Sequence, residues 1–142
     1  MGRLLCIDYG RRRCGIAATD SARIVATAIE TVATAQLESW LKKYLAAEQV
    51  DSIIVGQPRD LRGRDSESMN YIRPGVARLR KAFPDMPIVF FDERFTSALA
   101  HQAMLDGGLK KSARREKAVV DRMAATIILN DYLESRQYKS EQ

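Results

Sequence analysis

Histidine and cysteine are scarce in this sequence of 142 residues, which contains one histidine, His101, and two cysteines, Cys6 and Cys14. The cysteines show neither the spacing of a zinc site nor a disulfide framework, which disfavours a zinc hydrolase and a disulfide-stabilised scaffold. We interpret both as small buried hydrophobic side chains in a reducing compartment. His101 is expected in the middle of a helix, so a nucleophilic triad that depends on histidine is also disfavoured.

Long apolar runs and the common phosphate-binding motifs are absent as well. The sequence has no apolar run of about 18 residues, the length that crosses a membrane, and its first residues hold no signal-peptide core. We therefore expect a cytoplasmic protein with no membrane contact. Neither the P-loop pattern nor the dinucleotide-binding pattern occurs. The segment Asp8-Tyr9-Gly10 is similar to the phosphate hairpin of actin-like ATPases, but those enzymes close two domains around a nucleotide and this chain has room for one.

The composition is that of an ordinary globular protein, with 46% hydrophobic and 29% charged residues. At this length we expect one domain over residues 1–136, followed by a frayed tail over 137–142. The formal net charge of +5 is a mild excess and is weak evidence for a nucleic-acid partner by itself.

The positions of the positive charges are more informative. They gather in a tight turn, in a polar loop and in a segment that follows two glycines, namely Arg11, Arg12 and Arg13; Arg59, Arg62 and Arg64; and Lys110, Lys111, Arg114, Arg115 and Lys117. Two interpretations stay open, solvated loops or surfaces for the phosphate backbone of a nucleic acid. We expect the third segment to form a mobile flap, because glycines loosen its start and its charges repel one another.

Five segments have the hydrophobic pattern of strands. Apolar runs at 4–7 and 15–18 are typical of a hairpin, and the β-branched segment 24–29 extends its antiparallel part. Continuous apolar runs at 52–56 and 88–91 are typical of buried parallel strands.

Helical periodicity covers four further segments, at 34–48, 66–83, 96–105 and 116–135, with Thr34 as the expected N-cap of the first. Helices thus alternate with the later strands but not with the first three. This order predicts an α/β fold in which three antiparallel strands are followed by parallel ones.

Acidic residues follow directly on two of the predicted strands. Asp8 comes after the first apolar run, and Glu93 follows the last strand. Ligands gather outside the carboxyl ends of strands in open α/β sheets, so both carboxylates are candidates for catalysis or binding. At about 100° per residue, Asp121 shares a stripe of the last helix with Ala125 and Ile128, which predicts that it points toward the sheet.

A carboxylate on the buried face of a helix is costly unless it is paired or bound to a metal. Three inward acids without a cysteine or histidine partner indicate a hard cation, Mg²⁺ or Mn²⁺, because carboxylate oxygens suit these ions. A structural role for Asp121 stays open, since an acid near a helix start interacts favourably with the helix dipole or with a nearby arginine.

Four segments resemble, in order, the motifs of one bacterial family. They are Ile7-Asp8-Tyr9-Gly10-Arg11-Arg12-Arg13-Cys14-Gly15-Ile16-Ala17; Ile54-Val55-Gly56-Gln57-Pro58 with Gly63; Asp92-Glu93-Arg94-Phe95-Thr96-Ser97 with Ala100; and Lys117 through Asp121 with Ala124-Ala125, Ile127-Ile128-Leu129 and Tyr132-Leu133. They are similar to those of the YqgF family of RNase H-like proteins, which are also labelled Holliday junction resolvases. The resemblance spans nearly the whole chain.

This resemblance implies an RNase H-like fold, with a mixed five-stranded sheet flanked by helices, and a nuclease centre that uses two divalent ions about 3.5–4 Å apart. The acids that match the family are Asp8, Glu93 and Asp121, with Asp92 as a further candidate ligand. Arg94 is either a phosphate contact or the structural partner of a carboxylate. The three basic segments would then carry the phosphate backbone across the site.

The resemblance also implies a substrate, the precursor of 16S ribosomal RNA, cleaved during maturation of its 5′ end. Resolution of branched DNA at a Holliday junction is the alternative. A non-catalytic nucleic-acid-binding domain and an assembly factor that acts on the ribosome by protein contact stay open as well, and metal-dependent cleavage separates the nuclease from both. The expected partners are nucleic acid and the ribosome, and the sequence leaves open a monomer or a homodimer.

Overall fold

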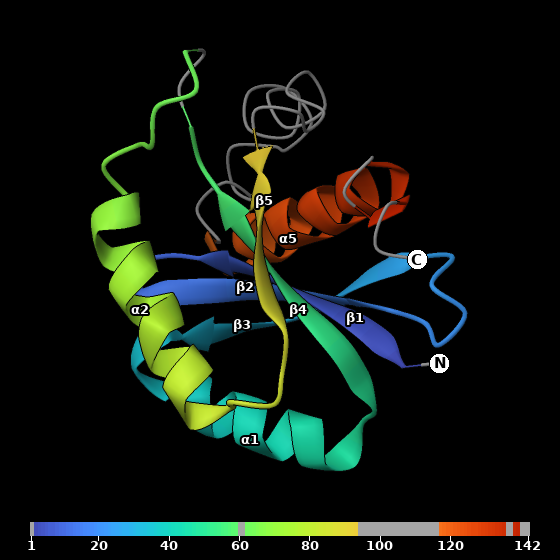
Figure 1. Cartoon of the computed structure of the whole chain (residues 1–142). Helices are drawn as coiled ribbons and strands as arrows, with labels where there is room; N and C mark the ends of the chain where they lie inside the picture. The colour runs from blue at the N-terminus through green and yellow to red at the C-terminus, as the bar shows by residue number, and fades with distance from the viewer. Residues whose placement is uncertain (1, 60–61, 94–116, 136–137, 140–142) are drawn as a thin grey trace.

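Five strands form one mixed sheet in the computed structural model, which describes residues 2–59, 62–93, 117–135 and 138–139 (Figure 1). The strands are β1 Arg3–Tyr9, β2 Arg13–Thr19, β3 Ala26–Ala33, β4 Val50–Gln57 and β5 Ile88–Asp92. Their order across the sheet is β3-β2-β1-β4-β5, with β1, β2 and β3 antiparallel and β1, β4 and β5 parallel. The predicted succession of antiparallel and then parallel strands is confirmed.

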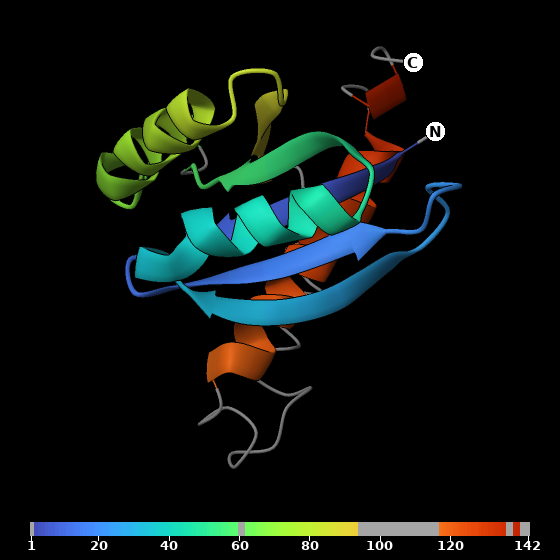
Figure 2. The same ribbon diagram turned by 90° about the horizontal axis from the view of Figure 1, so that it is seen from below.

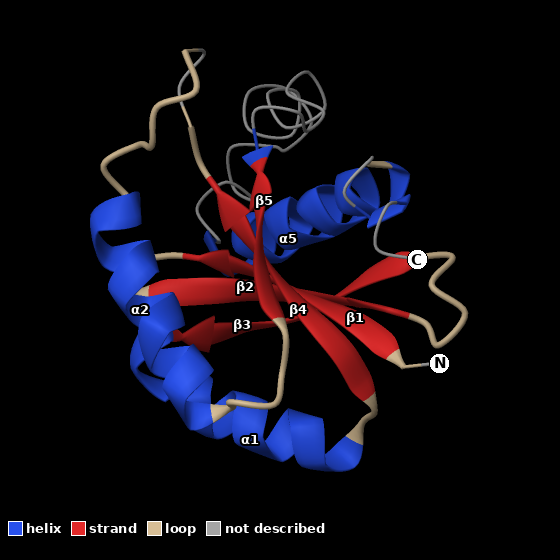
Figure 3. Cartoon of the chain, in the orientation of Figure 1, coloured by secondary structure: helices blue, strands red, loops and turns tan. Residues whose placement is uncertain are grey.

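Helices cover both faces of the sheet (Figures 2 and 3). They are the 3-10 turn η1 Thr34–Gln36 and the helices α1 Leu37–Ala47, α2 Met69–Ala82 and α5 Lys117–Glu134. Figure 2 shows α1 and α2 on one face and α5 across the other. Within the described ranges, no helix is long and apolar enough to span a membrane. The predicted helix at 96–105 lies outside the described residues.

The central strand β1 is buried on both faces because its side chains alternate between them. Leu5 and Ile7 pack with residues of α1 and α2, whereas Leu4 and Cys6 pack with residues of α5. β1 has a parallel neighbour on one side and an antiparallel one on the other, so its carboxyl end lies in the middle of the sheet edge. A residue at this end therefore has a neighbouring strand on each side, β2 and β4.

Helix α5 packs across β1, β2 and β3. Its buried residues include Ala125 and Ile128 of the predicted stripe, and Tyr132 one turn further on. A Cβ at Gly56, near the carboxyl end of β4, would lie 3.1 Å from Ile128 Cδ1. Tyr132 instead lines a pocket with Leu4, at the start of β1. Ile128 therefore marks the part of α5 that covers the carboxyl edge of the sheet.

Two predictions near the third strand are wrong. The strand runs over 26–33 rather than 24–29, because the amides of Ile24 and Val25 donate hydrogen bonds to Asp20 Oδ1 in the preceding turn, at 2.8 and 3.1 Å. Thr34 does not cap a helix: its hydroxyl donates a hydrogen bond of 2.7 Å to the carbonyl oxygen of Gly10. The chain then makes a 3-10 turn, and α1 begins at Leu37. Thr34 thus ties the start of this connection to the β1–β2 turn.

The chain beyond α5 includes one contact that bears on the expected frayed tail. The ring of Tyr138 packs on Tyr132 with the centroids 5.6 Å apart. The amide of Lys139 donates to the carbonyl oxygen of Ser135 at 3.2 Å. Tyr138 is thus part of the apolar cluster under α5, and the predicted boundary at 136 stays a prediction.

Candidate active site

Asp8 lies at the carboxyl end of the central strand, where it pairs with Gly15 of β2. The alternation of β1 places it on the α5 face, in series with Leu4 and Cys6. It is half-buried rather than exposed. The most central strand of the sheet thus presents a carboxylate at its end, on the face that the last helix covers.

Glu93 directly follows β5, and its carboxyl group folds back over the neighbouring strand β4. A Cβ at Gly56 would lie 2.9 Å from Glu93 Oε1 and 3.0 Å from Glu93 Cδ. Ile128 of α5 borders the same space, with its Cδ1 3.1 Å from that Cβ position. The carboxyl group therefore occupies a gap between β4 and α5 that depends on glycine at position 56.

The electrostatics of Glu93 show which carboxylates are its neighbours. Burial, followed by the charges of Asp8 and Asp92, raises the pKa of Glu93 from 4.5 to about 7. Cys6 has the same surroundings: burial, and then the charges of Asp8 and Glu93, raise the pKa of its thiol. A buried thiol with a raised pKa stays protonated and is a poor nucleophile. Asp8 and Glu93 thus lie together beneath α5, with an inert thiol below them.

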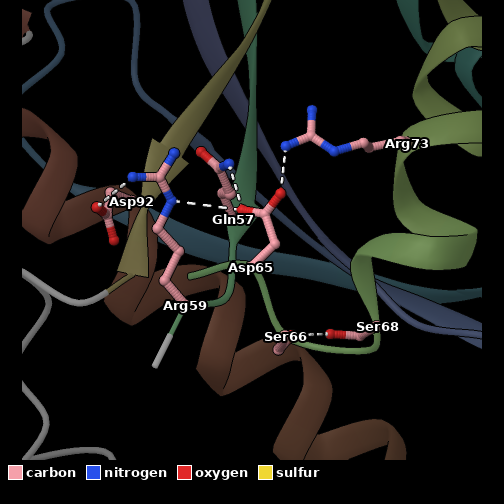
Figure 4. A network of polar contacts seen from close by, with 7 residues as sticks. All are labelled: Gln57, Arg59, Asp65, Ser66, Ser68, Arg73 and Asp92. Carbon is pink, nitrogen blue, oxygen red and sulfur yellow. Dashed lines mark hydrogen bonds and ion pairs between the residues drawn. The ribbon is translucent and has the colours of Figure 1, made fainter. Parts of the chain in front are cut away.

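Asp92 has a different environment from Glu93 although the two are adjacent. Its Oδ2 accepts a hydrogen bond of 3.3 Å from Arg59 Nη1 (Figure 4). Asp92 pairs in register with Gln57 at the end of β4. Ile88 and Phe90 of β5 pack on the α1 and α2 side, and alternation places Asp92 on that side too. The chain thus separates two consecutive acids, one in an arginine pair and one beside Asp8.

Arg59 belongs to a wider polar network that joins the ends of β4 and β5 to α2 (Figure 4). Its Nε lies 3.5 Å from Asp65 Oδ1, an ion pair that lacks hydrogen-bond geometry. Gln57 Nε2 donates to the same oxygen at 3.0 Å, and the Arg73 guanidinium binds the other oxygen of Asp65. Arg73, then Gln57 and Arg59, keep the pKa of Asp65 below its usual value. The sequence predicts Arg59 as a nucleic-acid contact, and the structure holds it between two carboxylates.

The remaining basic residues of the predicted nucleic-acid surface lie in three parts of the chain. Arg11, Arg12 and Arg13 lie in the β1–β2 turn and line one pocket with the start of α2. Arg62 and Arg64 are exposed in the loop after β4. The other predicted contacts, and the expected flap, lie outside the described side chains: Arg94, Lys110, Lys111, Arg114, Arg115 and Lys117.

Asp121 lies in α5, one turn before Ala125, which is fully buried. The side chains of 117–122 are outside the described part of the structure. Among the side chains that are described, no group of three or more histidines, cysteines and acids could hold a metal ion. What the structure brings together is Asp8 and Glu93, and the contribution of Asp121 stays a prediction.

Three features of this region were not predicted from the sequence. Gly56 makes the space for Glu93, Arg59 pairs with Asp92, and Tyr71 receives the guanidinium of Arg11 at 5.2 Å from its ring centroid. Gly56 follows an apolar run in the segment 54–58, and a glycine at the end of a buried strand is a signal of close approach. The two arginine contacts join residues that are distant in sequence, and no sequence pattern comparable to that glycine indicates them.

The donor set fits a hard divalent cation. Two half-buried carboxylates, one of which raises the pKa of the other, are costly unless a positive charge lies between them. Their oxygens are the ligands that Mg²⁺ and Mn²⁺ prefer, and the neighbouring Cys6 thiol, being protonated, competes poorly for such an ion. The pair of Asp8 and Glu93 is therefore suited to hold a hard metal ion rather than zinc.

A mixed sheet of strand order β3-β2-β1-β4-β5 with helices on both faces is a fold of the RNase H-like class. The fold agrees with that of RuvC from Thermus thermophilus, solved in complex with a Holliday junction substrate, at a TM-score of 0.57 over 94% of this chain and 96% of that one, with 14% sequence identity. A second structure of T. thermophilus RuvC agrees at a TM-score of 0.54, with 14% identity over 93% of this chain and 95% of that one. The expected fold is confirmed.

The family model of RuvX, described as Holliday junction resolvase, matches residues 2–135, and the chain belongs to this family of nucleases. A relative from Phocaeicola vulgatus is 54% identical over 97% of this chain and 99% of its own length. One from Bacteroides thetaiotaomicron is 47% identical over 97% of this chain and 100% of its own length. Both relatives carry the name "Putative pre-16S rRNA nuclease". The predicted membership of the YqgF family is confirmed.

Proposed function

We propose that this nuclease is a metal-dependent endonuclease that cleaves the precursor of 16S ribosomal RNA during maturation of its 5′ end. The observation that carries the mechanism is the pairing of Asp8 and Glu93 beneath α5, at the carboxyl edge of the sheet. Two carboxylates of this kind, placed in a gap that Gly56 keeps open, are suited to a reaction that needs concentrated positive charge at a phosphodiester.

Asp8 and Glu93 would hold two divalent ions, Mg²⁺ or Mn²⁺, and Asp121 would complete the set from α5. When bound, such ions activate a water molecule and stabilise the leaving oxygen of a phosphodiester. Asp8 is rigid because β1 is paired on both sides, and Glu93 is confined between Gly56 and Ile128. This confinement fixes the donor oxygens before the substrate arrives, which limits the reorganisation that the reaction requires.

Asp92 is not part of this donor set in our proposal. The ion pair with Arg59 satisfies its charge, and the alternation of β5 directs it to the α2 side. Arg59 in turn serves the structure of the edge, so the phosphate backbone is held by the other basic residues of the turn and loop: Arg11, Arg12, Arg13, Arg62 and Arg64, with Arg94, Lys110, Lys111, Arg114, Arg115 and Lys117 from the remaining segments.

The name shared by the relatives supports an RNA substrate, because they match 97% of this chain at up to 54% identity. The description of the family model supports the second candidate, a four-way DNA junction. Both substrates present the same phosphodiester to the same carboxylates, so the chemistry of the site does not separate them. We expect the ribosome to be a partner in the first case.

Cleavage by the purified protein tests the proposal. A 16S precursor fragment with its 5′ extension and a four-way DNA junction are incubated separately with Mg²⁺, Mn²⁺ or EDTA. We expect cleavage of the precursor with either ion and none with EDTA. Glu93→Gln should abolish cleavage, whereas Asp85→Asn, at an exposed acid in the loop before β5, should leave it unchanged.

Two outcomes would contradict the proposal. Cleavage of the junction alone would replace the RNA substrate with branched DNA. Tight binding of either substrate without cleavage in any metal would favour a non-catalytic binding domain, and Glu93→Gln would then leave binding as it was.

A further inference from the structure

One pocket formed by the described residues lies on the opposite face of the sheet from the acids. It has a volume of about 540 Å³, within the range of small-ligand sites, and it lies between the β1–β2 turn and the start of α2. Figure 1 shows this turn beside α2. Its lining residues are Gly10, Arg11, Arg12, Arg13, Glu67, Ser68 and Tyr71. Three guanidinium groups against one carboxylate make it a site for an anion.

An aromatic ring is built into the same pocket. The guanidinium of Arg11 lies over the ring of Tyr71 at 5.2 Å from its centroid, and Tyr9 packs beside that ring with centroids 6.4 Å apart. Tyr9 is buried against α2, where a Cβ at Gly75 would lie 2.3 Å from its Cζ. Tyr71 is half-buried and Arg11 is exposed. The outer side of this stack is thus a planar, cationic surface on a rigid base.

A planar cation on an aromatic ring is a platform for a nucleobase. Arginine planes and aromatic rings both stack on unpaired bases, whereas bases within a duplex are already stacked on one another. Arg12 is exposed beside the platform and has the charge to bind the phosphate of the same nucleotide. Glu67 repels phosphate, so the phosphate belongs on the side of the turn and the base on the side of α2.

The pocket is close to the acids along the chain. Gly10 is two residues after Asp8, about 7 Å of extended backbone. Asp8 faces α5 and Tyr9 faces α2, so the two sites share the carboxyl end of β1. A nucleic-acid strand that crosses this end can reach both sites within a few nucleotides.

We propose that this pocket binds one unpaired nucleotide of the substrate strand, with its base on the Arg11–Tyr71 stack and its phosphate at Arg12. The inference rests on the proposed function, because it assumes that the strand crosses the edge where Asp8 lies. It adds that the enzyme recognises a single-stranded segment beside the bond that it cleaves.

Binding without cleavage tests this proposal separately from the nuclease activity. Fluorescence anisotropy in EDTA is measured with a labelled single-stranded RNA of mixed sequence and with the blunt duplex of the same sequence. We expect Tyr71→Ala to weaken binding of the single strand about tenfold, the contribution of one stacked base, with the duplex unchanged. Tyr71→Phe keeps the ring and should bind as the unsubstituted protein does.

Two further variants, at exposed positions, test the proposal without changing a packed side chain. Arg12→Ala, at an exposed turn residue, should weaken binding of the single strand and lower its dependence on salt by about one phosphate contact. Lys42→Ala removes one positive charge from the exposed side of α1 and should change neither. A 2-aminopurine in the single strand should lose fluorescence on binding, and Tyr71→Ala should prevent that loss.

The proposal is overturned if Tyr71→Ala, with its thermal midpoint unchanged, binds the single strand as tightly as the unsubstituted protein. It is equally overturned if the duplex and the single strand lose the same affinity in Tyr71→Ala. Neither result depends on cleavage, so a protein that cleaves no substrate can still confirm the pocket, and an active nuclease can still refute it.

Discussion

Arg59 and Asp92 form an ion pair at the end of β5, with Arg59 Nη1 3.3 Å from Asp92 Oδ2. The pair is largely shielded from water, since the two side chains are 31% and 17% exposed. Asp92 is the immediate neighbour of Glu93 and one of the charges that raise its pKa. Arg59 therefore holds the acid next to Glu93 in an ion pair, which is why our proposal leaves Asp92 out of the metal-binding set.

We expect a double-mutant cycle to show this coupling. Arg59→Gln removes the cation of this pair, and Asp92→Asn removes the charge that the cation balances, so the double variant should be more stable than the single changes predict. For a partly buried pair the coupling free energy should be about 1 kcal/mol. Urea unfolding of the four proteins measures it. Additive losses would show that the pair contributes no net stability.

The space above Gly56 predicts the effect of a single methyl group. In Gly56→Ala the new Cβ would lie 2.9 Å from Glu93 Oε1, so the carboxyl group must move. We expect cleavage to fall strongly and stability to fall by about 1–3 kcal/mol, the usual cost of overpacking. Combining the change with Glu93→Ala is the control, because most of the stability cost should vanish when the carboxyl group is gone. An unchanged cost would assign the clash to Ile128 instead.

The raised pKa of Glu93 predicts a pH dependence of stability in the metal-free protein. The pKa of this group is 4.5 in the unfolded chain and about 7 in the folded protein, so the folded state keeps the proton up to a higher pH. Stability from this group is therefore greatest below pH 4.5 and is lost as the pH rises to about 7. The upper bound of this loss is about 3.5 kcal/mol, at about 1.4 kcal/mol for each unit of pKa.

Urea unfolding in EDTA at pH 5 and pH 7.5 measures this dependence. Glu93→Gln should lower the difference between the two pH values, and Glu30→Gln, at an exposed acid of β3, should leave it unchanged. Mg²⁺ should stabilise the unsubstituted protein at pH 7.5, because a bound cation removes the repulsion between Asp8 and Glu93. A pH difference that is the same in Glu93→Gln would contradict the assignment.

Asp121→Asn separates a metal ligand from a structural acid. As a ligand, Asp121 is needed for cleavage, and its loss should lower the rate by more than the roughly 10- to 100-fold that loss of an outer-shell partner costs. Folding and nucleic-acid binding should survive. As a partner of the helix dipole, it would contribute about 0.3–1 kcal/mol of stability and nothing to the rate. Thermal midpoint and cleavage measured on this one variant distinguish the two, and reduced stability with full cleavage would remove Asp121 from the centre.

The strands that the sequence predicts best are those with unambiguous burial. Segments 4–7, 53–55 and 88–91 are apolar without interruption, and each lies within a strand that has side chains packed on both faces. The bounds of the edge strand β3 are harder to predict, since its alanine and threonine residues fit an exposed edge strand and a turn equally well. Thr34 shows the same limit: its hydroxyl could cap a helix, and a distant carbonyl takes it instead.

The candidate site could be predicted in part for a related reason. Asp8 and Glu93 each follow a strand, and the rule that ligands gather at the carboxyl ends of strands places them at one edge. The sequence cannot choose between Asp92 and Glu93, because the chain leaves β5 at this point and strand alternation no longer applies. Our proposal favours Glu93 because Arg59 pairs with Asp92 and Gly56 leaves space for Glu93, and both of these residues come from the neighbouring strand and its loop.

The alternation of β1 places two consecutive residues of one strand on opposite faces of the sheet. Asp8 faces α5 and Tyr9 faces α2, although one peptide bond joins them. The acids and the proposed nucleotide pocket, which Tyr71 of α2 completes, therefore lie on the two sides of the same strand end. In our proposal a substrate strand bound at both sites passes over this end of β1, so the held base and the cleaved bond are expected to be only a few nucleotides apart.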